Sequence, residues 1–114
     1  MKYALLIYEK PGSNAVLTEP ERAAVTQEYF ALGEDARCVG GDQLQPVETA
    51  TTVRVQDGRT LTTDGPFAET KEVFGGYFLF DAASLDDALE LAARVPAAHR
   101  GGSVEVRPLV ERPS

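Results

Sequence analysis

The order in which strand-like and helix-like segments alternate constrains the fold of this chain more than any other feature. Two helix starts carry capping residues, Thr18 and Ser84, and each helix lies between two apolar, strand-like segments. Between these two β-α-β units lie two alternating segments joined by Asp57-Gly58, a pair that tolerates the positive φ of a tight hairpin turn. This order predicts an α+β fold in which two helices cover one face of a sheet.

Hydrophobic periodicity and turn residues give the expected boundaries. Strands are expected at residues 2–8, 39–44, 52–56, 59–62, 74–80 and 104–107, and helices at about 19–36 and 85–95. Thr18 and Glu21 form a capping box, and Pro96 ends the second helix. The predicted topology is a ferredoxin-like βαβ-hairpin-βαβ sandwich that occupies residues 1–114 as one domain, with a frayed tail at 111–114.

The composition is typical of a soluble globular protein with an acidic balance. The 114 residues are 43% hydrophobic and carry a net charge of −7. Nucleic acids and anionic membrane surfaces attract clustered Lys and Arg, so this balance argues against both as partners. No apolar run approaches the ~20 residues of a membrane helix, and the first residues show no signal-peptide cleavage pattern. We therefore expect a cytoplasmic protein.

Few side chains are suited to metal or nucleophilic chemistry. Cys38 is the single cysteine and His99 the single histidine, so we expect no disulfide, no metal and no cofactor. Cys38 is interpreted as a small core residue. His99 lies in a predicted turn, either as an exposed loop side chain or as a proton-transfer group. Glu105 and Arg107 share a strand face and either pair across the sheet or point into a cleft.

Residues 64–72 form the most unusual segment of the chain. They combine a Gly-Pro turn, an aromatic side chain and four ionisable groups between two strand-like runs. Loops that carry such groups commonly present them to a ligand, although a hairpin exit with hydrated charges would look similar. The candidate ligand-binding residues are Gly65, Pro66, Phe67, Glu72, Gly75 and Gly76. The last two lie inside a strand, where glycines indicate a bulge or a close approach by backbone or ligand.

Two residues of this segment are candidates for catalysis. Asp64 is suited to act as a general base or acid if it is partly buried; alternatively, its carboxylate accepts backbone N–H bonds and holds the turn. Lys71 is suited to an electrostatic role beside Asp64 or an anionic ligand group. The alternative for Lys71 is a surface ion pair with Glu69 or Glu72.

Three motifs in the same order resemble the DGPF proteins of the YCII-related family. They are D-G-P-F at 64–67 with the charged residues and Gly75-Gly76 that follow, G-D-Q-L-Q-P at 41–46, and V-E-V-R-P-L at 104–109. The resemblance covers residues 1–110. It strengthens Lys71 and Glu72 as candidate site residues, because both lie inside the family signature. It implies a dimeric α+β barrel and an association with extracytoplasmic-function sigma factors. The better-known branch of that family carries a histidine near its first helix, paired with an aspartate; residues 18–37 contain no histidine, so that pair cannot be transferred.

The expected function is the binding of a small organic ligand by a homodimer. Two helices leave one sheet face open, and a second copy is the simplest cover for an aromatic face to which Tyr3, Tyr77 or Phe78 contribute. The segment 64–72 would border the resulting cleft, with a regulatory role linked to sigma factors. Two alternatives remain: acid–base catalysis by Asp64 on a small carbonyl or hydroxyl compound, and a structural dimerisation module.

Overall fold

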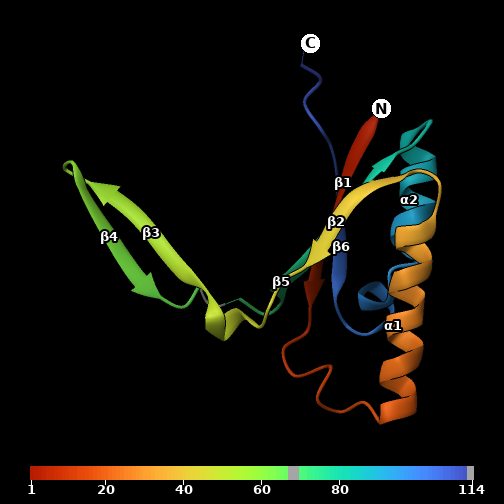
Figure 1. Cartoon of the computed structure of the whole chain (residues 1–114), viewed down its shortest axis with the longest axis horizontal. Coiled ribbons are helices and arrows are strands. Elements are labelled where there is room, and N and C mark those ends of the chain that lie inside the picture. The colour runs from red at the N-terminus through yellow and green to blue at the C-terminus, as the bar shows by residue number, and fades with distance from the viewer. Residues whose placement is uncertain (67–69, 113–114) are drawn as a thin grey trace.

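The computed structural model describes residues 1–66 and 70–112, so Phe67 and the last residues of the predicted frayed tail lie outside the described residues. The elements are β1 (Lys2–Glu9), α1 (Glu19–Glu34), β2 (Cys38–Gln43), the 3₁₀ helix η1 (Val47–Thr49), β3 (Thr51–Gln56), β4 (Arg59–Asp64), β5 (Val73–Asp81), α2 (Leu85–Ala93), the 3₁₀ helix η2 (Pro96–His99) and β6 (Ser103–Pro108). This order confirms the predicted β-α-β, hairpin, β-α-β arrangement (Figure 1).

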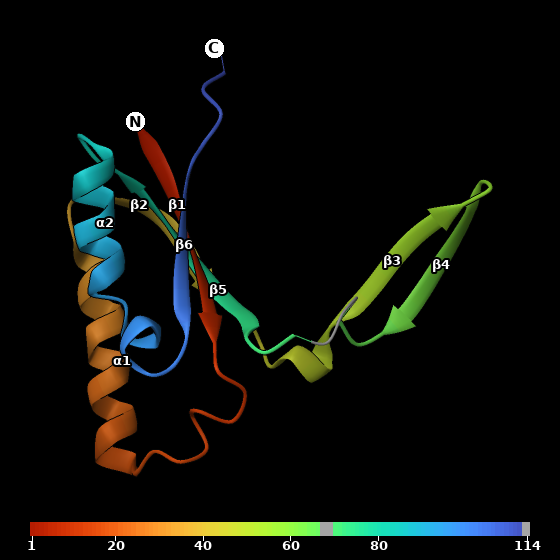
Figure 2. The same ribbon diagram turned by 180° about the vertical axis from the view of Figure 1, so that it is seen from behind.

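Four strands form the main sheet in the order β2-β5-β1-β6, and every neighbouring pair is antiparallel. Both helices cover the same face of this sheet, as Figures 1 and 2 show from opposite sides. The ferredoxin-like topology is therefore confirmed, with β3 and β4 inserted between β2 and β5 as a separate two-stranded sheet. None of the helices in the described part of the chain has the length and apolar character needed to span a bilayer.

Both helices begin at the predicted capping residues. The Thr18 hydroxyl accepts a hydrogen bond from the Glu21 N–H at 3.3 Å, and the Glu21 carboxylate accepts one from the Thr18 N–H at 2.9 Å. Ser84 accepts a bond from the Asp87 N–H at 3.2 Å. These bonds satisfy N–H groups that have no partner inside the helix.

Helix α1 ends at Glu34, two residues before the predicted boundary, because Asp35 leaves the helical conformation. The Asp35 carboxylate accepts three hydrogen bonds from Arg37, one from the backbone N–H and two from the guanidinium, at 2.8–2.9 Å. Arg94, at the end of α2, lies 3.7 Å from the same carboxylate. These bonds hold the pKa of Asp35 well below its usual range and connect the ends of both helices to the start of β2.

The hydrophobic core fills the space between the helices and the sheet. The largest fully buried side chains are Phe80, Leu5, Leu32, Leu91 and Val95. Tyr3 and Phe78 also face the helices, and half-buried Cys38 packs against the core, as expected. Leu32 is the one buried residue of α1, so most of this helix covers the sheet without packing tightly into the core.

The opposite face of the sheet carries a second set of apolar side chains, here called the open sheet face. The strand register places Leu6, Tyr8, Phe74, Tyr77 and Leu79 on it, because side chains alternate between the faces. The rings of Tyr8 and Phe74 lie 5.5 Å apart, and Phe74 is 38% exposed. No element of the described chain covers this face as the helices cover the other (Figure 1).

The hairpin formed by β3 and β4, residues 51–64, is here called the arm. Asp57 and Gly58 both have positive φ, at 50° and 75°, which confirms the predicted tight turn. At the other end the Gly65 N–H donates to the Ala50 carbonyl at 2.6 Å, which continues the ladder. The arm projects away from the main sheet (Figures 1 and 2) and raises the radius of gyration to 16.1 Å. A compact chain of this length has about 13 Å.

Candidate functional site

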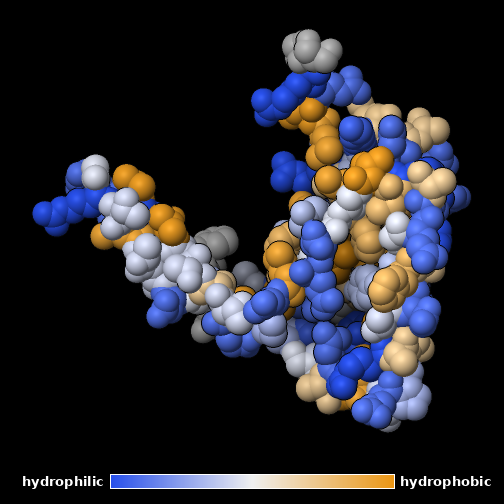
Figure 3. All heavy atoms as spheres, in the orientation of Figure 1, coloured by the Kyte–Doolittle hydropathy of each residue, from blue (hydrophilic) through white to orange (hydrophobic). Residues whose placement is uncertain are grey.

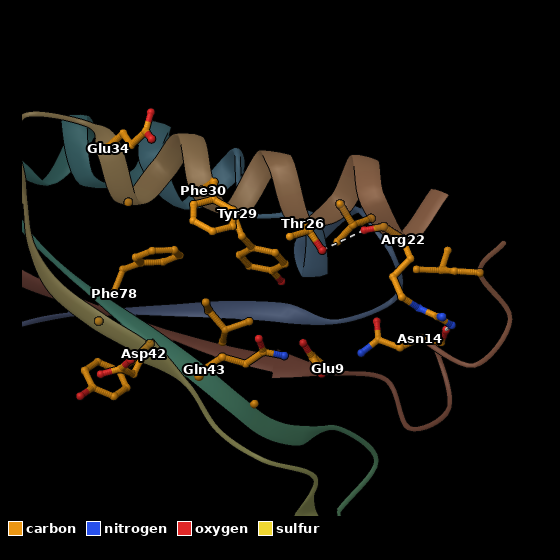
Figure 4. A pocket seen from close by; sticks show the side chains of 18 residues that line it. Glu9, Asn14, Arg22, Thr26, Tyr29, Phe30, Glu34, Asp42, Gln43 and Phe78 are labelled. Atoms are coloured by element: carbon orange, nitrogen blue, oxygen red, sulfur yellow. Dashed lines mark hydrogen bonds between the residues drawn. The ribbon is translucent and has the colours of Figure 1, made fainter. Parts of the chain in front are cut away.

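A cavity of about 740 Å³ lies between α1 and the main sheet (Figure 4). The inward side chains of α1 line one side, and β1, β2 and β5 line the other. Three glycines, Gly41, Gly75 and Gly76, contribute no side chains to the strand side. The cavity therefore exists because α1 packs tightly only near Leu32, while the sheet beneath its earlier turns is low in side-chain volume.

Aromatic rings form the apolar wall of the cavity. The rings of Tyr29 and Phe78 are stacked, with centroids 6.4 Å apart and planes 21° apart. Phe78 also contacts Phe80 of the core at a centroid distance of 5.6 Å, which anchors the wall. Phe30 lies at the cavity and is 63% exposed. This arrangement presents flat surfaces of the kind that pack against a planar ring.

Glu9 and Tyr29 bring acid–base groups to the cavity from opposite sides. Glu9 ends β1, and Figure 4 shows its carboxylate directed toward the space below Tyr29. Burial raises the pKa of the Tyr29 phenol, and the nearby Glu9 carboxylate raises it further. At neutral pH the phenol therefore keeps its proton and can donate a hydrogen bond, while the carboxylate can accept one.

Arginine side chains hold one end of the cavity together. Arg22 donates to the Asn14 carbonyl at 3.0 Å. Arg100 donates to the Asn14 side chain at 3.2 Å and to the Ser13 carbonyl at 2.6 Å. Arg22 and Asn14 both line the cavity, so this end brings a guanidinium to a lining that also carries the carboxylates of Glu9, Glu34 and Asp42.

The predicted site residues fall into two groups. Gly75 and Gly76 line the cavity. Asp64 ends β4 at the base of the arm and is exposed. The remaining described candidates also lie outside the cavity lining: Gly65 and Pro66 follow Asp64, and Lys71 and Glu72 precede β5. Their roles in ligand binding or catalysis stay predictions.

The bulge or close backbone approach predicted for the two glycines of β5 is confirmed, whereas their role in ligand binding stays a prediction. The register with β1 shifts between Ile7 and Tyr8, so that Gly75 forms a bulge. A Cβ atom on Gly75 would lie 2.9 Å from the Glu9 side chain, and one on Gly76 would lie 2.8 Å from the Asp42 carbonyl. Gly75 therefore leaves room for the carboxylate, and Gly76 allows β2 to approach.

Three other polar candidates lie away from the cavity. His99 is exposed in η2, and its ring is hydrogen-bonded with the Ala93 carbonyl. Glu105 and Arg107 occupy the register positions of β6 on the open sheet face, opposite Leu6 and Ala4. Within residues 1–66 and 70–112, no three His, Cys, Asp or Glu side chains gather as a metal site.

Sequence reasoning missed Glu9 and Arg22 as site residues. The available signals were an acidic residue directly after the apolar run of the first strand and an arginine in the first turns of a predicted helix. Both patterns are common in hydrated surfaces, so neither points to a cavity without the fold.

A family model for the YCII-related domain matches residues 1–112. The chain belongs to the YCII-related family. It is 38% identical over 114 residues to an uncharacterised protein of Rhizobium meliloti, covering 96% of this chain and 92% of that protein. This membership confirms the resemblance drawn from the three motifs.

A solved structure shares the fold. It is a 5-chloro-2-hydroxyhydroquinone dehydrochlorinase from Burkholderia phenoliruptrix in complex with 2,5-dihydroxybenzoquinone, with a TM-score of 0.56 and 17% sequence identity. The match covers 98% of this chain and 96% of that one. At this level of identity the likeness establishes a common fold between this YCII-related chain and that enzyme.

Proposed function

We propose that this protein binds a small, planar, hydroxylated organic molecule in the cavity beneath α1. The observation that carries the proposal is the cavity itself, at about 740 Å³, with an aromatic wall and a few polar groups. Its volume falls within the range of about 300–1,000 Å³ that is usual for small-molecule sites, and such sites combine apolar walls with few orienting groups.

The lining indicates the chemistry of the ligand. The stacked rings of Tyr29 and Phe78 suit a flat ring. A ligand oxygen would accept a hydrogen bond from the Tyr29 phenol, and a ligand hydroxyl would donate one to Glu9. The structurally similar dehydrochlorinase is solved with 2,5-dihydroxybenzoquinone, a ring compound of this kind. This supports a hydroxylated ring as the first ligand class to test.

Calorimetric titration with 2,5-dihydroxybenzoquinone and related hydroquinones tests the proposal. We expect Tyr29→Phe to weaken binding by about 2- to 12-fold and Glu9→Gln by about 10- to 100-fold, because the latter removes a charged acceptor. Tyr8→Phe, on the open sheet face, and Glu48→Gln, an exposed residue of η1, are matched controls. Binding that is equally strong in all four variants would refute the assignment.

Acid–base catalysis is the second candidate function. It is favoured by the pairing of a carboxylate, Glu9, with a protonated phenol, Tyr29, inside a cavity. In this reading Glu9 accepts the proton of a ligand hydroxyl. The sequence-based alternative places the reaction at Asp64, which is exposed at the base of the arm. Assaying turnover of chlorinated hydroxyhydroquinones in Glu9→Gln and Asp64→Asn separates the two, since only the variant at the true site should lose activity.

The homodimer remains part of the proposal. The open sheet face carries five large apolar residues, and a second copy packed face to face would remove them from water. Sedimentation over a range of concentrations tests this association. A dimer that binds no ring compound would favour the reading as a structural dimerisation module, and the link to sigma factors stays a prediction.

A further inference from the structure

The arm and the open sheet face lie on the same side of the molecule. Figure 1 shows the helices on one side of the main sheet and the arm on the other. In the space-filling view of Figure 3 a deep notch separates the arm from the body. One wall of this notch is the open sheet face, with Tyr8, Phe74 and Tyr77. The other wall is the arm.

The arm exposes apolar side chains on both strands. Val53 is 59% exposed, Val55 67% and Leu61 43%. Register places Val53 and Val55 on one face beside Thr60 and Thr62, which also carry methyl groups. In the described chain β3 and β4 make their principal contacts with each other. A two-stranded hairpin that packs against nothing else is only marginally stable in water, so a surface that covers the arm would stabilise it.

We propose that the arm of each copy packs the face that carries Val53 and Val55 against the body of a second copy, which lies in the notch. The inference rests on the homodimer of the proposed function and adds the arm as its second contact surface. A two-fold axis would place each copy in the notch of the other, so both open sheet faces and both arms become covered in one closed assembly.

The area that a stable dimer must bury supports a second copy of the chain in the notch. With strands about 4.8 Å apart and six to nine residues long, the open sheet face covers about 470 Å² in projection, which is about three-fifths of the roughly 800 Å² per partner in a typical interface. One face of the arm adds about 200 Å², and the partner's arm covers about as much again. The sheet face with both arms reaches the typical area, whereas the sheet face alone does not.

Charge also favours contact between an arm and a body. The arm carries Arg54 and Arg59 together with Asp57 and Asp64 and is therefore neutral, so the net charge of −7 belongs to the rest of the chain. Two acidic bodies repel each other, but a neutral arm can lie against an acidic partner without adding like-charge repulsion.

Analytical ultracentrifugation of arm variants tests the inference. Val53→Glu/Val55→Glu should raise the dimer dissociation constant at least about 100-fold, because it replaces two apolar contacts with charges that must lose water. The matched control, Gln56→Glu/Thr63→Glu, adds the same charge on the opposite face of the arm and should leave the constant within about threefold.

Amide hydrogen exchange of the wild-type protein gives a second readout that needs no substitution. Residues 53–62 should exchange rapidly in the dilute monomer and become protected at concentrations where the dimer forms. A dimer whose arm exchanges freely, or whose dissociation constant is unchanged in Val53→Glu/Val55→Glu, would refute the arm contact but not the dimer itself. A wild-type protein that stays monomeric would overturn both. Ligand titration is independent of either outcome.

Discussion

The adjacent glycines at the start of β5 give the sharpest test of the site geometry, because a methyl group on each would meet a different kind of neighbour. In Gly76→Ala the new Cβ would lie 2.8 Å from the Asp42 carbonyl oxygen and 3.3 Å from the Gln43 Cα, both in the backbone of β2. In Gly75→Ala it would lie 2.9 Å from the Cδ atom of Glu9, a side chain that can rotate away. The same substitution should therefore have different costs.

The expected free energies of unfolding follow from these contacts. Neither glycine has positive φ, so alanine gains about 0.4–1 kcal/mol at both positions by restricting the unfolded chain. Gly76→Ala must push β2 from β5, and such overpacking costs about 1–3 kcal/mol. Gly75→Ala requires a shift of the Glu9 rotamer, at about 0.5–1.5 kcal/mol. We expect Gly76→Ala to lose about 1–2 kcal/mol of stability and Gly75→Ala to stay near wild type.

Thermal and urea unfolding measure the difference directly. For a domain of this size Gly76→Ala should lower Tm by about 4–8 °C, while Gly75→Ala should change it by no more than about 2 °C. Gly75→Ala should instead weaken binding of 2,5-dihydroxybenzoquinone, because it displaces the Glu9 carboxylate from its place at the cavity. Equal loss of stability in both variants, or a neutral Gly76→Ala, would refute the steric argument.

Three further predictions concern the scaffold. Thr18→Ala should lower the free energy of unfolding, measured in urea, by about 1 kcal/mol, because it removes the N-cap of α1. Thr18→Ser keeps the capping hydroxyl and should retain this stability. The pKa of Asp35 is depressed by its bonds to Arg37, so the carboxylate stabilises the fold above about pH 4 and this contribution disappears as the pH falls further. Asp35→Asn should thus be less stable at pH 7 and lose less stability between pH 5 and about pH 2; an unchanged pH profile would contradict this. Phe80→Ala should lose about 3–5 kcal/mol, against under ~1 kcal/mol for the exposed Phe30→Ala; similar losses in the two variants would place the core elsewhere.

The elements could be predicted because their signals are local. The caps at Thr18 and Ser84 and the turn at Asp57-Gly58 are each written within four residues, and the structure places helices and hairpin where these signals indicate. The end of α1 was harder to predict, because it depends on Asp35 turning back to bond with Arg37. Nothing in the helical periodicity of the sequence reports that bond.

The cavity could not be predicted because it depends on how α1 lies over the sheet. Tyr29 lies on α1, but Glu9, the carboxylate near it, lies on another element, twenty residues away in sequence. The direction of the arm was equally hidden. The alternation of Val53 and Val55 with polar residues predicts a strand with one covered face, yet it does not say which molecule covers that face.

Strand β1 is the first element of the chain, yet its two neighbours in the sheet are β5 and β6, which come last. A ribosome adding about 5–20 residues per second needs roughly 3–13 s to reach β5 after completing β1. Throughout that interval the apolar run from Tyr3 to Tyr8 has no strand to pair with, which is a condition for aggregation during synthesis. Production of this protein should therefore depend on chaperones and on translation rate more than its small size suggests.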